Sequence, residues 1–131
     1  MNYTTARAFR QALNDRLSVI AKREGLDLSR LQRRVAFERF LARMFQYANH
    51  DFILKGGYAL ELRLGGKARA TIDLDFAAPL LAERELLEVL QTAAETDTQD
   101  FFRFVLALAV PPELIGPPEG GFRFRVEVYL D

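Results

Sequence analysis

Residues 53–76 read ILKGGYALELRLGGKARATIDLDF, and this stretch decides what kind of fold the chain can form. A short apolar run is followed by the Gly56-Gly57 pair, which is typical of a turn. The next residues, YALELRL, have the pattern of about two helical turns and stop at a second Gly-Gly pair. The last part alternates between apolar and polar residues, which is typical of a strand. The stretch therefore predicts strand, turn, short helix and strand.

The alternating strand at residues 69–77 is expected to have two different faces. Side chains two residues apart lie on the same face of a strand. The buried face would carry Ile72, Leu74 and Phe76, and the polar face would carry Thr71, Asp73 and Asp75.

Two amphipathic helices are predicted before this stretch. Thr4 or Thr5 can cap the first helix, whose apolar stripe ends at Gly25. Ser29 and Gln32 have the spacing of a capping box for the second helix. After residue 76, LAERELLEVLQTAAE is typical of an amphipathic helix, and FFRFVLALAV and FRFRVEVYL are typical of strands.

These elements predict an α+β fold, with two N-terminal helices followed by a small mixed β-sheet that has helices on one face and an open polar face opposite. Residues 1–131 are expected to form a single domain, helical over 1–50 and with an α/β core over 51–131. The last strand stops at Asp131, where a hairpin would normally turn back. We therefore expect the sequence to be the N-terminal part of a longer protein, truncated at its C-terminus.

The composition excludes cysteine-dependent sites and favours the cytoplasm. The 131 residues include no cysteine, which excludes disulfides and thiolate metal sites and suits a reducing environment. The N-terminus lacks the apolar segment of a signal peptide, and no apolar run approaches the roughly 20 residues that span a bilayer. A cytoplasmic protein without membrane contact is expected.

Positive charge is concentrated near the N-terminus, although the net charge is zero. Residues 1–50 hold ten Lys and Arg against four acidic residues. Such a segment could guide a polyanion. For the four arginines of the second helix, a solvated helix face is favoured over RNA contact; they are Arg33, Arg34, Arg39 and Arg43.

Phenylalanine is frequent, with 11 residues in the chain. Their helical and strand spacing indicates that six of them belong to the core and do not form a platform for stacking bases. These six are Phe37, Phe40, Phe45, Phe101, Phe102 and Phe104.

Asp73 and Asp75 place two like charges on one strand face, so a cation should accompany them. A divalent metal is one answer, because Mg²⁺ is commonly held by one or two carboxylates together with substrate phosphates. The alternative is a salt bridge with Arg69 or Lys67. The pair alone leaves both open.

Gly56-Gly57 lies between a predicted strand and a predicted helix, where bare backbone N–H groups meet the positive end of a helix dipole. Such a turn is a ready anion site. Together with a following strand that bears two acids, it would place a triphosphate beside its metal. Metal-assisted nucleotidyl transfer needs this combination.

Residues 54–76 resemble the signature of the DNA polymerase beta-like nucleotidyltransferase superfamily, in which a Gly-Gly or Gly-Ser turn precedes an Asp-x-Asp strand. The ending formed by Arg69, Thr71, Asp73 and Asp75, and the leading helix VAFERFLARMF, are similar to the narrower group of AbiEii/AbiGii-type toxin nucleotidyltransferases of type IV toxin–antitoxin and abortive-infection systems. The resemblance implies a nucleotidyltransferase-like core.

The resemblance also implies roles for particular residues. Asp73 and Asp75 would be catalytic and bind Mg²⁺ or Mn²⁺, and Gly56 and Gly57 would hold the β- and γ-phosphates of a nucleoside triphosphate. The phosphate charge would be neutralised by Arg69 and Lys55. The nucleotide would pass to an acceptor hydroxyl, with tRNA or another RNA as a candidate acceptor and a cognate antitoxin as a candidate partner.

The superfamily has a third carboxylate on a later strand, and it is not assigned to Glu127 here, because the resemblance places it on a strand after Asp131. Without that carboxylate, we do not expect the fragment to complete the reaction on its own. Two alternatives stay open: a non-catalytic nucleotide- or antitoxin-binding module, and a structural α+β domain whose acids pair with basic side chains.

Overall fold

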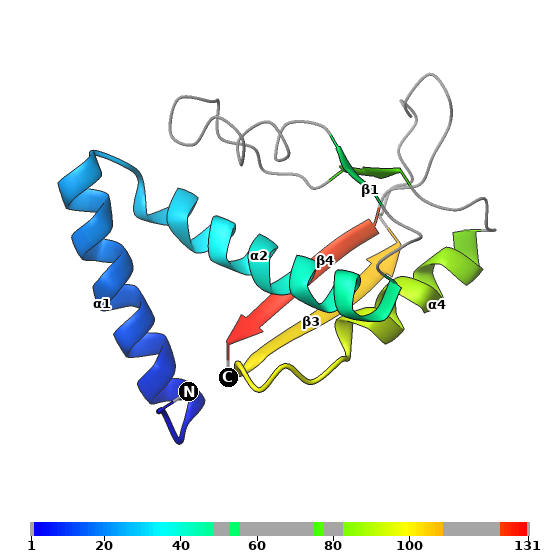
Figure 1. Ribbon diagram of the computed structural model, residues 1–131, viewed down its shortest axis with the longest axis horizontal. Coiled ribbons are helices and arrows are strands. Elements are labelled where there is room, and N and C mark those ends of the chain that lie inside the picture. Colours follow the sequence, from blue (N-terminus) through cyan, green and yellow to red (C-terminus); the bar gives the residue numbers. More distant parts are fainter. Residues whose placement is uncertain (1, 49–52, 56–74, 78–82, 109–123, 131) are drawn as a thin grey trace.

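The computed structural model describes residues 2–48, 53–55, 75–77, 83–108 and 124–130. Within these residues the chain forms helices and strands in the order α1 (Ala6–Glu24), α2 (Leu28–Ala48), β1 (Ile53–Lys55), β2 (Asp75–Ala77), α4 (Glu83–Ala94), β3 (Phe102–Leu108) and β4 (Phe124–Leu130) (Figure 1). The predicted α+β class, with two helices leading, is confirmed.

Both predicted ends of α1 are found. Thr5 is the N-cap, with extended backbone and a hydroxyl that accepts a hydrogen bond from the Ala8 N–H at 3.1 Å. Gly25 ends the helix in the left-handed conformation at φ 66°. Its N–H and that of Leu26 both donate to the carbonyl of Ala21. These bonds satisfy backbone groups that a helix end leaves open.

The start of α2 differs from the prediction. The helix begins at Leu28, and the carbonyl of Asp27 accepts the first intrahelical bond, from the Leu31 N–H at 3.3 Å. Ser29 therefore lies inside the first turn, so the capping-box prediction is wrong. Asp27 occupies the cap position, for which aspartate is equally suited. Gln32 instead donates to Asn14 Oδ1 of α1 at 3.0 Å and so joins the two helices.

A small apolar core joins α1 to the first half of α2. Its buried members are Leu17, Ala21 and Leu31. Leu26, just after the helix end, packs against them and extends this core through the turn between the helices. No helix in the described part of the chain is long and apolar enough to cross a membrane.

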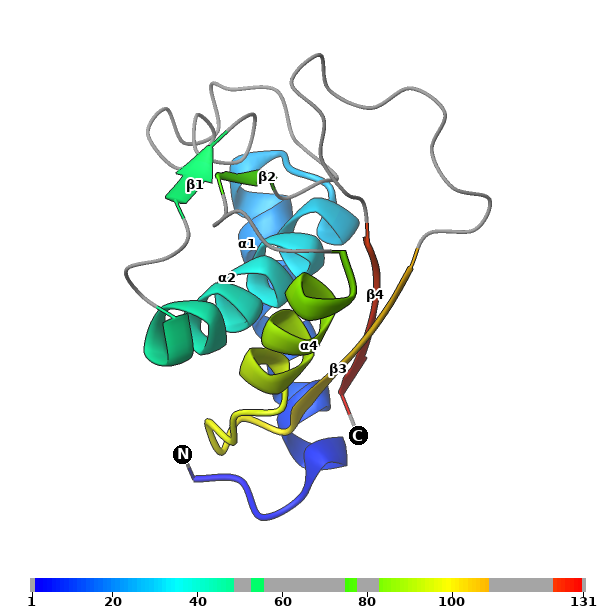
Figure 2. The same ribbon diagram turned by 90° about the vertical axis from the view of Figure 1, so that its right-hand side faces the viewer.

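The larger core lies between the helices and the β3–β4 pair. β3 and β4 are antiparallel from Phe102↔Leu130 to Leu108↔Phe124. α2 and α4 lie on the same side of this pair, which Figure 2 shows edge-on. The buried side chains are Phe40, Met44, Leu86, Leu90, Ala93, Ala94, Phe104 and Leu106. Helices on one face of the sheet, as predicted, are thus observed.

The opposite face of β3–β4 is exposed and carries the polar residues Arg103, Arg125, Glu127 and Tyr129, as predicted, but also Val105 and Ala107. The guanidinium of Arg103 lies 4.2 Å from the ring centroid of Tyr129, its partner across the strands. Arg125 forms an ion pair with Glu127 at 3.2 Å. An exposed ion pair of this kind contributes little to stability.

β1 and β2 form a second antiparallel pair, with Ile53↔Ala77, Leu54↔Phe76 and Lys55↔Asp75 as partners. The strands in the described part of the chain therefore form two separate antiparallel pairs. In both views, β1 and β2 lie beyond one end of the β3–β4 pair (Figures 1 and 2).

Candidate functional site

The β1–β2 pair brings together two of the residues predicted for the site. Lys55 is the last residue of β1, Asp75 is the first of β2, and the register makes them direct partners. Opposed residues of an antiparallel pair have Cα atoms about 4.5–5.5 Å apart. The fold therefore places a lysine beside an acid from a distant part of the sequence.

The remaining predicted site residues lie outside the described part of the chain. These are Gly56, Gly57, Arg69 and Asp73. Their roles stay predictions. What the structure adds is that the chain leaves the strand pair at Lys55 and returns to it at Asp75. The segment that holds all four of these residues therefore begins and ends beside the Lys55–Asp75 pair.

The residues around this place fit a divalent metal by their chemistry. Carboxylate oxygens, as in Asp73 and Asp75, are the donors that Mg²⁺ prefers, usually with phosphate oxygens and water completing its shell. Lys55 offers a compact positive charge suited to phosphate. The described residues contain no group of three or more acidic, histidine or cysteine side chains that could hold a metal, so the metal site stays a prediction.

A buried ion-pair network was missed by the sequence analysis. Asp100, just before β3, lies between two arginines of α2. Arg43 donates to both of its carboxylate oxygens, at 2.7 and 3.0 Å, and Arg39 donates from Nε at 2.7 Å. The Arg43 side chain is only 3% exposed and that of Asp100 only 7%. This network links α2 to the loop directly before β3.

Further bonds complete the surroundings of Asp100 and Arg43. The hydroxyl of Thr98 and the N–H of Phe102 also donate to Asp100. Arg43 donates in addition to the carbonyl of Phe102 and lies 4.8 Å from the Phe104 ring centroid. Burial by itself would raise the pKa of Asp100, but the hydrogen bonds, led by that from Arg43, hold this pKa well below its usual range.

The network corrects the expectation of a solvated arginine face. Arg34 does form an exposed pair with Glu38 at 3.3 Å, but Arg43 is buried and Arg39 is bound to Asp100. The sequence held a signal for this. Arg43 comes three residues after the buried Phe40 and directly before the buried Met44, so it lies on the side of the helix that faces the core. A buried charge there needs a partner of opposite charge.

Glu127 has both carboxylate oxygens engaged on the polar face of β4. Oε1 accepts from Arg125 at 3.2 Å, and Oε2 accepts from the Tyr129 hydroxyl at 2.7 Å.

The class of protein comes from comparison with family models, which gives a nucleotidyl transferase. The comparison with family models gives the particular family: the model described as "Nucleotidyl transferase AbiEii toxin, Type IV TA system" matches residues 39–130. The match covers well over half of the chain, and the chain belongs to this family. A search of curated proteins gives no match.

Membership confirms the resemblance seen in residues 54–76 and carries general consequences. The family is one of nucleotidyltransferase toxins of type IV toxin–antitoxin systems. Nucleotidyltransferase activity, a nucleoside triphosphate as substrate and an antitoxin as partner follow from it in general terms.

Proposed function

We propose that this chain forms the nucleotide-transfer centre of a metal-dependent toxin, which moves a nucleotide from a nucleoside triphosphate to an acceptor hydroxyl. The observation that carries the proposal is the pairing of Lys55 with Asp75. This pairing brings together the two ends of the segment 56–74, which contains Gly56, Gly57 and Asp73.

The proposal gives each residue a distinct task. The backbone N–H groups of Gly56 and Gly57 would bind the β- and γ-phosphates, because bare N–H groups at a helix start attract anions. Lys55 and Arg69 would neutralise the phosphate charge. Asp73 and Asp75, two residues apart, would lie on one strand face and hold Mg²⁺ or Mn²⁺.

The chemistry is a displacement at the α-phosphorus. The acceptor oxygen forms a bond to this phosphorus, the bond to the bridging oxygen of pyrophosphate breaks, and the acceptor proton passes to a base or to water. A metal bound at this place would supply positive charge to the attacking and leaving oxygens. The glycine turn and the two basic side chains hold the triphosphate so that pyrophosphate can leave in line.

RNA, such as tRNA, is the acceptor class we propose, in the cytoplasm and under control of a cognate antitoxin. The support is electrostatic. Exposed Arg7, Arg16 and Lys22 keep positive charge on α1, whereas Asp100 offsets one of the two positive charges of Arg39 and Arg43. A basic helix can steer a polyanion toward a neutral protein.

The test is thermal unfolding of the protein with ATP, GTP, CTP and UTP, each with and without Mg²⁺. A ligand at 100 times its dissociation constant adds about 2.7 kcal/mol of stability, which raises Tm by roughly 5–10 °C for a domain of this size. We expect such a rise with at least one nucleotide in the presence of Mg²⁺. Asp73→Asn and Asp75→Asn should abolish it.

Asp15→Asn is the matched control, because it removes an exposed carboxylate on α1 whose contact is with Gln11. It should keep the full nucleotide response. Transfer of radioactive nucleotide to an RNA pool then separates an enzyme from a binding module, since a non-catalytic module would bind nucleotide and label nothing. If no nucleotide shifts Tm with Mg²⁺, or if both aspartate variants respond like the parent protein, the proposed site is wrong.

A further inference from the structure

The loop between α4 and β3 holds two strained residues. Gln99 has φ 55° and Phe101 has φ 66°, and they are the non-glycine residues with positive φ in the described part of the chain. Each left-handed residue of this kind costs about 1–2 kcal/mol. Strain of this kind persists where the surroundings enforce it, and it gathers at binding and active sites.

Hydrogen bonds of two acids enforce this loop conformation. Asp97 Oδ1 accepts from the Gln99 N–H at 2.8 Å, and Asp100 Oδ1 accepts from the Phe102 N–H at 3.0 Å. Asp100 is in turn held by Arg43. With Asp100 buried, Asp97 and Gln99 are left exposed on the outside of the loop.

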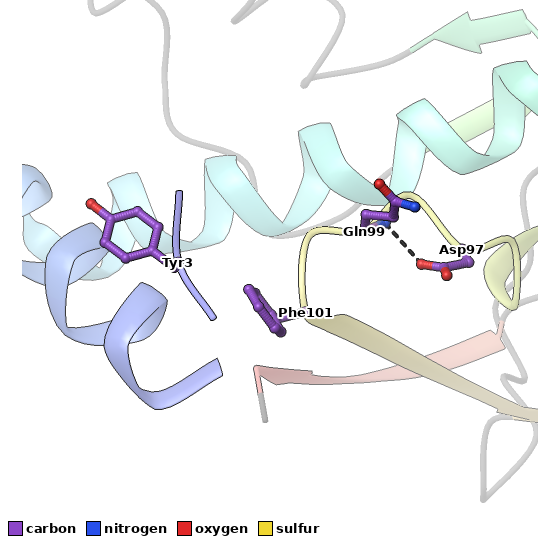
Figure 3. A pocket seen from close by; sticks show the side chains of 4 residues that line it. All are labelled: Tyr3, Asp97, Gln99 and Phe101. Atoms are coloured by element: carbon purple, nitrogen blue, oxygen red, sulfur yellow. Dashed lines mark hydrogen bonds between the residues drawn. The ribbon is translucent and has the colours of Figure 1, made fainter. Parts of the chain in front are cut away.

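These outward residues line a hollow of about 430 Å³ together with Tyr3 and Phe101 (Figure 3). Tyr3 comes from the N-terminal segment and Phe101 from the loop. Phe9 of α1 lies between them, with ring centroids 5.7 Å from Tyr3 and 5.9 Å from Phe101. The aromatic cluster therefore joins two segments that are distant in sequence into one wall.

The chemistry of the lining selects the charge of a ligand. Two aromatic rings line the hollow, Asp97 brings a carboxylate of which one oxygen accepts from the Gln99 N–H, and the Gln99 side chain brings an amide carbonyl. Among the residues that the structure describes, no lysine or arginine lines the hollow. A carboxylate repels anions, whereas aromatic faces and a carboxylate together attract a cation.

We propose that this hollow binds the guanidinium group of an arginine side chain. A guanidinium is planar and stacks on an aromatic ring, and its N–H groups can donate to a carboxylate. A lysine ammonium fits less well, because it cannot stack and holds its water more strongly. The hollow lies at the opposite end of the β3–β4 pair from β1 and β2, so the proposal is independent of the nucleotide site (Figures 1 and 2).

The arginine can come from a protein partner or from a free arginine-like molecule. The experiment is an NMR titration of the ¹⁵N-labelled protein with N-acetylarginine amide, following the amide signals of Gln99 and Phe101. We expect saturable shifts with a dissociation constant of roughly 1–10 mM, as befits one exposed ion pair with ring stacking. N-acetylcitrulline amide, the neutral analogue of the same shape, should give no saturable shift.

Asp97→Asn provides the matched variant. An asparagine oxygen can still accept from the Gln99 N–H, so the loop should persist while the charge is lost. Binding should weaken about fivefold, and Asp15→Asn should bind like the parent protein. Unchanged signals of α1 in the spectrum will verify that the Asp97→Asn variant is folded.

A second arm identifies the source of the arginine. Tighter binding of an arginine-containing peptide than of the blocked amino acid would point to a protein partner, and equal binding would point to a free arginine-like molecule. The proposal is overturned if the citrulline analogue shifts the same signals equally, if Asp97→Asn binds as well as the parent, or if the shifts do not saturate.

Discussion

Replacing Arg43 by methionine should destabilise the protein by about 3–4 kcal/mol. Methionine matches much of the buried length of the side chain, so the main loss is electrostatic. The two bonds from Arg43 to Asp100, at 2.7 and 3.0 Å, disappear, and a carboxylate with a 7% exposed side chain loses its chief partner. Removing one member of a buried pair costs about 3–5 kcal/mol. The lower part of that range applies, since Arg39 and Thr98 still donate to Asp100.

Urea unfolding followed by circular dichroism measures this difference. The matched control is Arg34→Met, which breaks an arginine–glutamate pair in the same helix whose side chains are 40% and 50% exposed. This control should cost no more than about 0.5 kcal/mol, because water solvates both charges once they separate. Asp100→Asn combined with Arg43→Met should cost less than the sum of the two single changes, since each removes the partner of the other.

The reasoning is refuted if Arg43→Met costs under about 1 kcal/mol, within the range of surface ion pairs. It is equally refuted if the two single changes add without coupling. Either result would mean that Arg39, Thr98 and the Phe102 N–H satisfy Asp100 without Arg43.

Three further results are expected. The pKa of Asp100 is lowered in the folded protein. Its contribution to the free energy of unfolding is therefore complete above the ordinary aspartate pKa of about 3.9 and is lost as the pH falls below that value. Below about pH 4, the free energy of unfolding should consequently fall less steeply with pH for Asp100→Asn than for the parent protein. Thr5→Ala removes the bond to the Ala8 N–H and should lower the free energy of unfolding by about 1 kcal/mol, whereas Thr5→Ser should restore most of it. Gly25→Ala should cost about 1–2 kcal/mol in urea unfolding through the left-handed backbone alone, because a Cβ there would meet nothing within 4 Å; a neutral result would show that the turn can relax.

The sequence predicted features that depend on neighbouring residues. A threonine before an apolar stripe and a glycine after it mark α1 because capping and left-handed backbone are local properties. The same local reasoning failed at α2, where Asp27 and Ser29 are both suited to a cap and the motif could not decide between them. The strand that carries Asp75 was also predicted, since alternation is local.

What the sequence did not predict depends on contacts between distant segments. The pairing of Arg43 with Asp100 and of Lys55 with Asp75 arises only when strands and helices assemble. The prediction that six phenylalanines belong to the core is right for some of them and wrong for others, for the same reason. Phe40 and Phe104 are core as expected, but Phe45 is 37% exposed and Phe101 lines the hollow in a left-handed turn that no periodicity could indicate.

The family match divides the molecule along its two cores. The larger core, from Phe40 to Leu106, falls wholly inside residues 39–130, and so does Asp100. The core of Leu17, Ala21 and Leu31 falls wholly outside the match. Lys55 and Asp75 also lie inside the match, whereas α1 and the first half of α2 lie outside it and have a core of their own. Because Tyr3 lies outside the match and Phe101 inside it, the hollow is lined from both parts of the chain, and the proposed arginine site needs both of them.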